Sequence, residues 1–170
     1  QEFEIGAVPV RAQRLSYVGE LGWEIFVSTE FAGYLFEMLL SGDKAASPRL
    51  VGSHAGESLR TEKANRHWGH EMGYCDTPLE AGLMFACKLD KPNGFVGREA
   101  LIQRREDGAD HRVLQFLLGN PDAFIYHHEP VFCGGNVVGN ITTGTYGHSL
   151  GSAVGLGVVK VPAEMSVEEL

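Results

Sequence analysis

Residues 16–26 read SYVGELGWEIF, and they contain two stretches of β-branched and aromatic residues separated by Gly-Glu-Leu-Gly. Alternating flanks around a short glycine-containing break are typical of a β-hairpin, with Gly19 and Gly22 in its turn. Glu20 lies at the tip of this predicted hairpin. Two interpretations follow: Glu20 is a solvated turn residue, or its carboxylate accepts hydrogen bonds from a ligand with adjacent N–H groups.

Composition narrows the classes of function. The chain has 170 residues, of which 44% are hydrophobic, so it can bury a core as one or two small domains. Its formal net charge is -8, and no block of Lys and Arg is interleaved with aromatic residues. We therefore expect no nucleic-acid partner and no anionic membrane partner. No apolar run in the sequence approaches the length that spans a bilayer.

The three cysteines, Cys75, Cys87 and Cys133, are odd in number and far apart. This pattern favours neither a disulfide framework nor a CxxC metal site, and it predicts a reducing compartment: the cytoplasm, or the mitochondrial matrix in a eukaryote. The sequence begins at Gln1, within a stretch that already resembles a strand. We expect the chain to be a piece of a longer protein.

The first part of the chain mixes strand-like and helical patterns. Alternating apolar residues predict strands, and apolar residues three or four apart predict helices. Ser28 or Thr29 can cap the first helix, and Gly42 can end it. The predicted elements are an extended segment over 8–17, a strand over 23–27, helices over 31–39, 53–64 and 98–106, and a turn from 78 that leads into a buried strand through Phe85 and Cys87.

After the charged stretch REDGADHR (105–112), the sequence consists almost entirely of strands and turns. The strand-like segments are VLQFLL (113–118), PVF (130–132), VVGNITTG (137–144) and AVGLGVVKV (153–161). This succession of short strands and turns predicts a small β-barrel or sandwich. The fold class is therefore α+β, with an α+β domain over 1–108 and an all-β domain over 109–170.

Arg60 lies in SLRTEK (58–63) on the second predicted helix. Glu57 is three residues earlier, so the two side chains can form a surface ion pair, which typically contributes about 0.3–0.5 kcal/mol. Alternatively, Arg60 points inward and binds an anionic ligand through its planar guanidinium.

The stretch RHWGHEMG (66–73) contains His67, His70 and Glu71, residue types that bind metals. Gly69 and Gly73 argue against the regular helix that would align these side chains, and no complete ligand set such as HExxH is present. We predict no metal site.

Three stretches together resemble the C-terminal part of the glycine cleavage T-protein (aminomethyltransferase) superfamily, from about Val8 to Val161. They are residues 16–26, SLRTEKANRHWGHEMGYCDTPLEAGLMFACKLDKPNGFVGREAL (58–101) and GGNVVGNITTGTYGHSLGSAVGLGVV (134–159). The most specific elements are TPLEAGL, KLDK and FVGREAL in order, and the Gly-Glu-x-Gly hairpin. SYVGELGWE and TYGHSLGSAVGLG are most similar to the folate-binding region of sarcosine and dimethylglycine dehydrogenases.

The resemblance implies a fold and an activity. The fold is part of a ferredoxin-like α+β domain followed by a small Greek-key β-barrel. In the dehydrogenases a flavin domain oxidises an N-methyl amine, and the T-protein-like region passes the one-carbon unit to tetrahydrofolate. A free T-protein takes an aminomethyl group from a lipoyl carrier instead. For this chain the resemblance implies tetrahydrofolate as the cofactor, a small methyl-amine or aminomethyl donor as the partner, and FAD in an upstream domain.

The resemblance also assigns candidate residues. Glu20 occupies the position of the hairpin glutamate that binds the pterin N–H groups, and Arg60 matches an arginine that lines the same cavity. Tyr17 matches a wall of that cavity, and Tyr146 is a further candidate. The family's catalytic aspartate belongs to the N-terminal half that precedes this sequence. We therefore assign no catalytic residue here and expect the fragment alone to be inactive.

Two alternative functions remain open at this point. The chain could belong to a folate-dependent methyltransferase without flavin, which demethylates a sulfonium or related donor, or to a non-catalytic folate-binding protein. A structural module without a ligand is the plainest alternative, because fold alone does not fix function. We also expect self-association through apolar residues that would face the rest of the longer protein, namely Leu21, Trp23 and Trp68.

Overall fold

The computed structural model describes residues 1–42 and 48–161, so the part of the predicted all-β domain after Val161 lies outside the described residues. The chain divides into two compact units, Gln1–Leu59 and Arg60–Leu170. Within the described residues, no helix combines the length and the apolar composition that crossing a bilayer requires.

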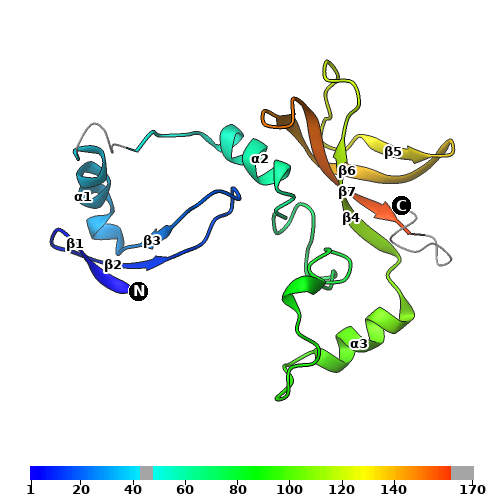
Figure 1. Ribbon diagram of the computed structural model, residues 1–170, viewed down its shortest axis with the longest axis horizontal. Coiled ribbons are helices and arrows are strands. Elements are labelled where there is room, and N and C mark those ends of the chain that lie inside the picture. The colour runs from blue at the N-terminus through cyan, green and yellow to red at the C-terminus, as the bar shows by residue number, and fades with distance from the viewer. Residues whose placement is uncertain (43–47, 162–170) are drawn as a thin grey trace. The chain divides into compact units, whose positions relative to one another are not determined.

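The first unit contains a three-stranded antiparallel sheet and helix α1 (Figure 1). The strands are β1 (Glu2–Ile5), β2 (Val8–Gln13) and β3 (Glu24–Phe26), in the order β1-β2-β3. Burial alternates along β2, as the two-residue period of a strand requires. Val8 and Val10 pack with Leu35 of α1 to form the small core of this unit.

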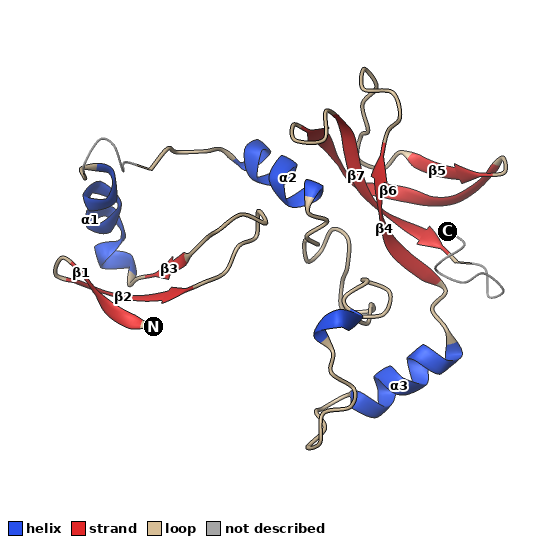
Figure 2. Cartoon of the chain, in the orientation of Figure 1, coloured by secondary structure: helices blue, strands red, loops and turns tan. Residues whose placement is uncertain are grey.

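The predicted hairpin is present, but the prediction of a short turn between its strands was wrong. Strands β2 and β3 pair with Gln13 opposite Glu24, and residues 14–23 connect them as a long loop with bends at 17–21 (Figure 2). The chain folds back on itself within this connection. A Cβ on Gly22 would lie 3.0 Å from the Leu15 carbonyl oxygen, and Gly19 has a φ of 77°. The flanks therefore contact each other as a compact loop instead of extending the strand ladder.

The three predicted helices are confirmed. They are α1 (Thr29–Leu40), α2 (Ser53–Glu62) and α3 (Arg98–Asp107). Ser28 takes the N-cap position of α1 in an extended conformation, although its side chain makes no capping hydrogen bond. These helices follow from local apolar spacing and from breaker residues near their ends, which explains why sequence patterns found them.

The predicted buried strand through Phe85 and Cys87 was wrong. This segment is the short 3₁₀ helix η1 (Met84–Ala86), and Phe85 is 87% exposed. The backbone hydrogen bonds here are local: Leu83 N–H donates to the Pro78 carbonyl, and Cys87 N–H donates to the Met84 carbonyl. An apolar run in a chain of turns has the composition of a buried strand but no neighbouring strand to pair with.

The all-β tail is confirmed as a four-stranded antiparallel sheet in the order β4-β7-β6-β5 (Figures 1 and 2). The α+β class is confirmed with it. The central strand β7 is almost wholly buried, with Val154 and Leu156 at its core. The predicted domain division at residue 108 stays a prediction. The strands are β4 (His111–Leu117), β5 (Pro130–Cys133), β6 (Asn136–Gly147) and β7 (Ser152–Lys160).

Gly144 on β6 is required by close packing, because a Cβ there would overlap the backbone carbonyl of Ile125. We expect Gly144→Ala to lower the free energy of unfolding by about 1–3 kcal/mol, the usual cost of overpacking a core. Gly119→Ala is the matched control, since a Cβ added at Gly119 would meet nothing within 4 Å. Thermal unfolding measures both, and equal melting temperatures for the two variants would contradict the packing argument.

Candidate functional site

In the first unit, the β2–β3 connection presents a carboxylate among aromatic and apolar groups. Glu20 is exposed, and Tyr17, Leu21 and Trp23 expose much of their side chains beside it in the sequence. A carboxylate accepts N–H hydrogen bonds, and aromatic faces stack on flat rings. Residues of these types can contact a flat heteroaromatic ring that carries N–H donors. The buried Ser16 hydroxyl of the same loop has no hydrogen-bond partner among the described residues.

Sequence reasoning missed a second carboxylate in this hairpin. Glu24 is exposed, begins β3, and lies opposite Gln13 of β2. Strand pairing holds its backbone more firmly than the bends hold Glu20. The signal was present in residues 16–26, where Glu24 interrupts a flank that is otherwise apolar. Both carboxylates are therefore candidates for a ligand contact.

In the second unit, Arg60 is 0% exposed and bonds to other buried polar groups. Its Nη1 lies 3.2 Å from Glu71 Oε2 and 2.9 Å from the Asn65 carbonyl oxygen, and its Nη2 lies 2.9 Å from Thr143 Oγ1. The Thr143 hydroxyl in turn donates to Glu71 Oε1. Arg60 points inward, but its guanidinium binds groups of this chain. Its contact with folate stays a prediction.

Glu71 accepts hydrogen bonds from three segments of the chain. Burial by itself would raise the pKa of Glu71, but the Thr143 hydroxyl, the His67 N–H at 2.6 Å and the Arg60 guanidinium outweigh burial and lower that pKa below its ordinary value. The carboxylate is therefore ionised and faces a buried cation. The hydrogen bonds around this buried ion pair compensate for the water that both charged groups lose on burial.

A β-bulge directs two consecutive threonines towards the same carboxylate. The register of β6 against β7 shifts between Ile141 and Thr143. In a regular strand, adjacent side chains point to opposite faces, whereas a bulge redirects one of them. The Thr142 hydroxyl lies 3.3 Å from Glu71 Oε1 and 3.0 Å from the Leu156 carbonyl oxygen, so it joins Thr143 at Glu71.

The end of α2 is attached to the four-stranded sheet at two further points. The Gln115 side-chain amide of β4 donates to the carbonyls of Thr61, at 2.7 Å, and Glu62, at 3.1 Å. These carbonyls belong to the last turn of α2, where helices leave acceptors without intrahelical partners. The Glu62 carboxylate accepts the Ser149 N–H at 2.8 Å. The end of α2 and the β6–β7 connection are thereby held together.

Tyr146 is half-buried on β6, three residues beyond Thr143, and its ring lies 5.3 Å from the His148 ring. The structure thus brings the predicted residues Arg60 and Tyr146 into one compact unit. It places Tyr17 and Glu20 on one loop of the other unit. The self-association predicted through Leu21, Trp23 and Trp68 stays a prediction.

Four imidazole rings form a row in the second unit. Ring centroids are 4.4 Å apart for His67 and His70, 6.1 Å for His70 and His127, and 4.0 Å for His127 and His128. Glu71, the acidic residue of the same RHWGHEMG stretch, is turned inward to Arg60. Over residues 1–42 and 48–161, no group of three His, Cys, Asp or Glu side chains is arranged to hold a metal ion.

A second charged cluster joins the turn over residues 76–80, α3 and the start of β4. His111 Nε2 lies 2.8 Å from Asp76 Oδ1, and its Nδ1 lies 2.7 Å from Asp110 Oδ1. Arg104 lies 2.7 Å from Glu80 and 3.2 Å from Asp110. Burial would lower the pKa of His111, but its bonds to the two aspartates outweigh burial and raise that pKa above its ordinary value.

This cluster predicts a pH-dependent contribution to stability. Because the folded-state pKa of His111 is raised, its contribution is complete below the ordinary histidine pKa of about 6.5 and is lost as the pH rises through the raised pKa. We expect His111→Gln to lower the melting temperature by a few degrees at about pH 6 and much less at alkaline pH.

Thermal unfolding across the pH range, with His54→Gln as the control, measures this contribution. His54 is exposed on α2 and lies outside the charged cluster. A difference between wild type and His111→Gln that stays constant or grows as the pH rises would contradict the assignment.

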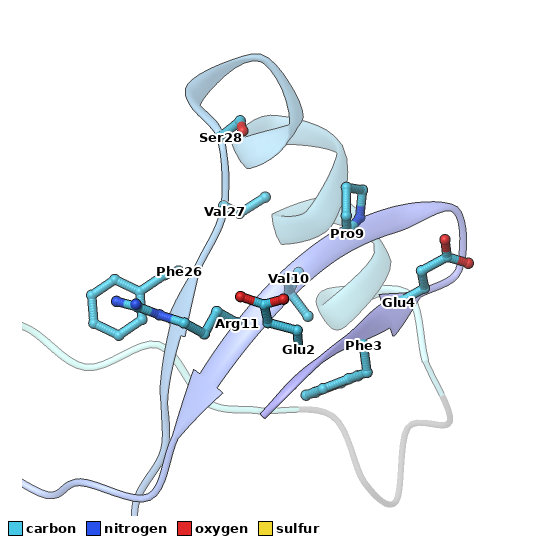
Figure 3. A pocket seen from close by; sticks show the side chains of 9 residues that line it. All are labelled: Glu2, Phe3, Glu4, Pro9, Val10, Arg11, Phe26, Val27 and Ser28. Carbon is cyan, nitrogen blue, oxygen red and sulfur yellow. The ribbon is translucent and has the colours of Figure 1, made fainter.

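A shallow hollow of about 610 Å³ lies on the sheet of the first unit (Figure 3). Arg11 reaches over the Phe26 ring there, 4.8 Å from its centroid, with Glu2 opposite it on β1. The residues that line the hollow do not include any of the four predicted site residues. The hollow is therefore separate from the loop that carries Tyr17 and Glu20.

Comparison with known protein families identifies both parts of the chain. Residues 1–91 match the GCVT N-terminal domain, and residues 111–169 match the glycine cleavage T-protein C-terminal barrel domain. The chain belongs to the glycine cleavage T-protein family. The two matches occur in the family's order and together cover most of the sequence.

Individual relatives agree with this family. A 4-methylaminobutanoate oxidase (formaldehyde-forming) from Paenarthrobacter nicotinovorans is 42% identical over 90% of this chain and 19% of its own length. The mitochondrial dimethylglycine dehydrogenase of Mus musculus is 39% identical over 98% of this chain and 19% of its own length. The chain therefore spans about a fifth of these relatives.

A crystal structure of the glycine cleavage system aminomethyltransferase T from Bartonella henselae is similar to this chain, with a TM-score of 0.77 at 28% identity. The match covers 94% of this chain and 44% of that protein. The T-protein fold predicted from the sequence motifs is thus confirmed at the level of the family.

Proposed function

We propose that this chain is the tetrahydrofolate-binding, C-terminal part of an enzyme that transfers a one-carbon unit from an N-methyl or aminomethyl donor to tetrahydrofolate. The observation that carries the proposal is the match of both T-protein regions, in order, to residues 1–91 and 111–169. Relatives of both kinds, demethylating oxidoreductases and aminomethyltransferases, support transfer of a one-carbon unit as the shared chemistry.

The donor that we propose is an N-methyl amino acid. Dimethylglycine and 4-methylaminobutanoate, after which the two relatives above are named, both carry a methyl group on nitrogen. We further propose that FAD, bound in a preceding part of the full-length protein, oxidises this donor. The mitochondrial relatives support the matrix as the location in a eukaryote, and the cytoplasm is the corresponding bacterial compartment.

Within this chain, we assign pterin binding to the β2–β3 connection. Glu20 accepts hydrogen bonds from the pterin N–H groups, and Tyr17 forms a wall beside it. Tyr146 is a further contact from β6. Arg60 contributes indirectly, because its side chain is buried and bound to Glu71 and Thr143. Tetrahydrofolate supplies the nitrogen atoms that accept the one-carbon unit.

Neutralising Glu20 tests the pterin assignment. We expect Glu20→Gln in the full-length protein to weaken tetrahydrofolate affinity about tenfold to a hundredfold, because hydrogen bonds to a charged group contribute about 1.5–3 kcal/mol. Anaerobic calorimetry measures the dissociation constant. Oxidation of an N-methyl amine, followed with an artificial electron acceptor, is expected to keep its wild-type rate.

Two further variants sharpen the test. Glu4→Gln changes an exposed glutamate on β1 and should bind tetrahydrofolate like the wild type. Glu24→Gln changes the other carboxylate of the hairpin. Wild-type affinity in Glu20→Gln together with weak binding in Glu24→Gln would move the pterin contact to the start of β3. A wild-type protein that binds no tetrahydrofolate would disprove the proposed function itself.

A further inference from the structure

Three side chains from distant parts of the sequence form a closed ring of hydrogen bonds. Arg60 comes from the end of α2, Glu71 from the RHWGHEMG stretch, and Thr143 from β6. Each of the three bonds to the other two: Arg60 donates to Glu71 and to Thr143, and Thr143 donates to Glu71. Because the Thr143 hydroxyl is acceptor and donor at once, it fixes the direction of both bonds.

A buried ion pair is by itself weak evidence for a role in stability. Replacing a buried ion pair with apolar residues is often neutral or stabilising, whereas removing one partner is costly. What the ring adds is geometry: a planar guanidinium, a carboxylate and a bulged strand admit few mutual arrangements. The ring therefore fixes where β6 lies relative to the end of α2 and to the stretch 66–73.

The fixed strand is the one that carries Tyr146. Thr143 and Tyr146 are three residues apart on β6, and the β6–β7 connection that follows is bound to Glu62 through Ser149. A shift of β6 after loss of the ring would move Tyr146 and the backbone around it. A misplacement of about 1 Å in an enzyme site can lower the reaction rate about a hundredfold.

We propose that Glu71 and Thr143 are positioning residues of the folate site, which act by holding Arg60 and β6 in the geometry that presents Tyr146 to the ligand. This inference rests on the proposed function. It adds two buried residues that the resemblance did not assign, and neither of them contacts the ligand. Thr143 is the sharper probe, since it can be replaced without changing the shape of the side chain.

The test compares two buried threonines, one inside the ring and one outside it. Thr143→Val removes a buried hydroxyl with two partners, whereas Thr61→Val removes a buried hydroxyl that has no hydrogen-bond partner among the described residues. Both are made in the full-length protein. Anaerobic calorimetry with tetrahydrofolate measures the dissociation constant at a temperature where thermal unfolding shows each variant to be folded.

We expect Thr143→Val to raise the dissociation constant about tenfold to a hundredfold, the range in which supporting partners of a site typically act. Thr143→Ser, which keeps the hydroxyl, should restore the wild-type dissociation constant. Thr61→Val should bind like the wild type. Glu71→Gln, which removes the charge and keeps the shape of the side chain, should weaken binding like Thr143→Val. If Thr143→Val does not fold, the dissociation constant of Glu71→Gln tests the positioning role instead.

The outcomes separate this inference from the proposed function. A folded Thr143→Val with a lower melting temperature and a wild-type dissociation constant would show that the ring is only structural. Equal weakening by Thr61→Val would also overturn the inference, because the effect would then be unspecific. A wild-type protein that binds no tetrahydrofolate would overturn the proposed function and this inference together.

Discussion

The buried ion pair between Arg60 and Glu71 is the interaction on which the second unit depends. Both side chains are excluded from solvent, and an uncompensated charge in such a place is strongly destabilising. The donor and acceptor atoms of the pair therefore need hydrogen-bond partners within the protein. The Asn65 carbonyl, the His67 N–H and the Thr143 hydroxyl meet this requirement, and they come from segments that are irregular or distant in the sequence.

This requirement explains features that would otherwise look like local irregularities. The bulge in β6 brings Thr142 and Thr143 to the same carboxylate, which a regular strand would not do. The Gln115 amide satisfies carbonyls at the end of α2, so the turn that contains Arg60 is attached to β4 as well as to β6. A continuous polar framework thus joins one helix end to a sheet whose own core is apolar.

The candidate residues of the two units lie in different kinds of local structure. Tyr17 and Glu20 lie in a solvent-exposed loop whose shape depends on glycines and on close backbone contacts. Arg60 lies among buried hydrogen bonds, and its side-chain partners set its position.

The sequence by itself determined the three helices, the pairing of the hairpin strands, the β-rich tail and the family. These features depend on local periodicity, on breaker residues and on short motifs, all of which can be read along the chain. Sequence patterns failed at Phe85, where composition indicated a strand but burial depends on a neighbour that no local pattern supplies.

Only the tertiary structure decided the partners of Arg60. The guanidinium meets Glu71, eleven residues away, and Thr143, eighty-three residues away, and no local sequence pattern indicates either partner. Polar groups that are buried together lose their water and hydrogen-bond to one another instead. Which groups are buried together depends on how distant segments fold against one another.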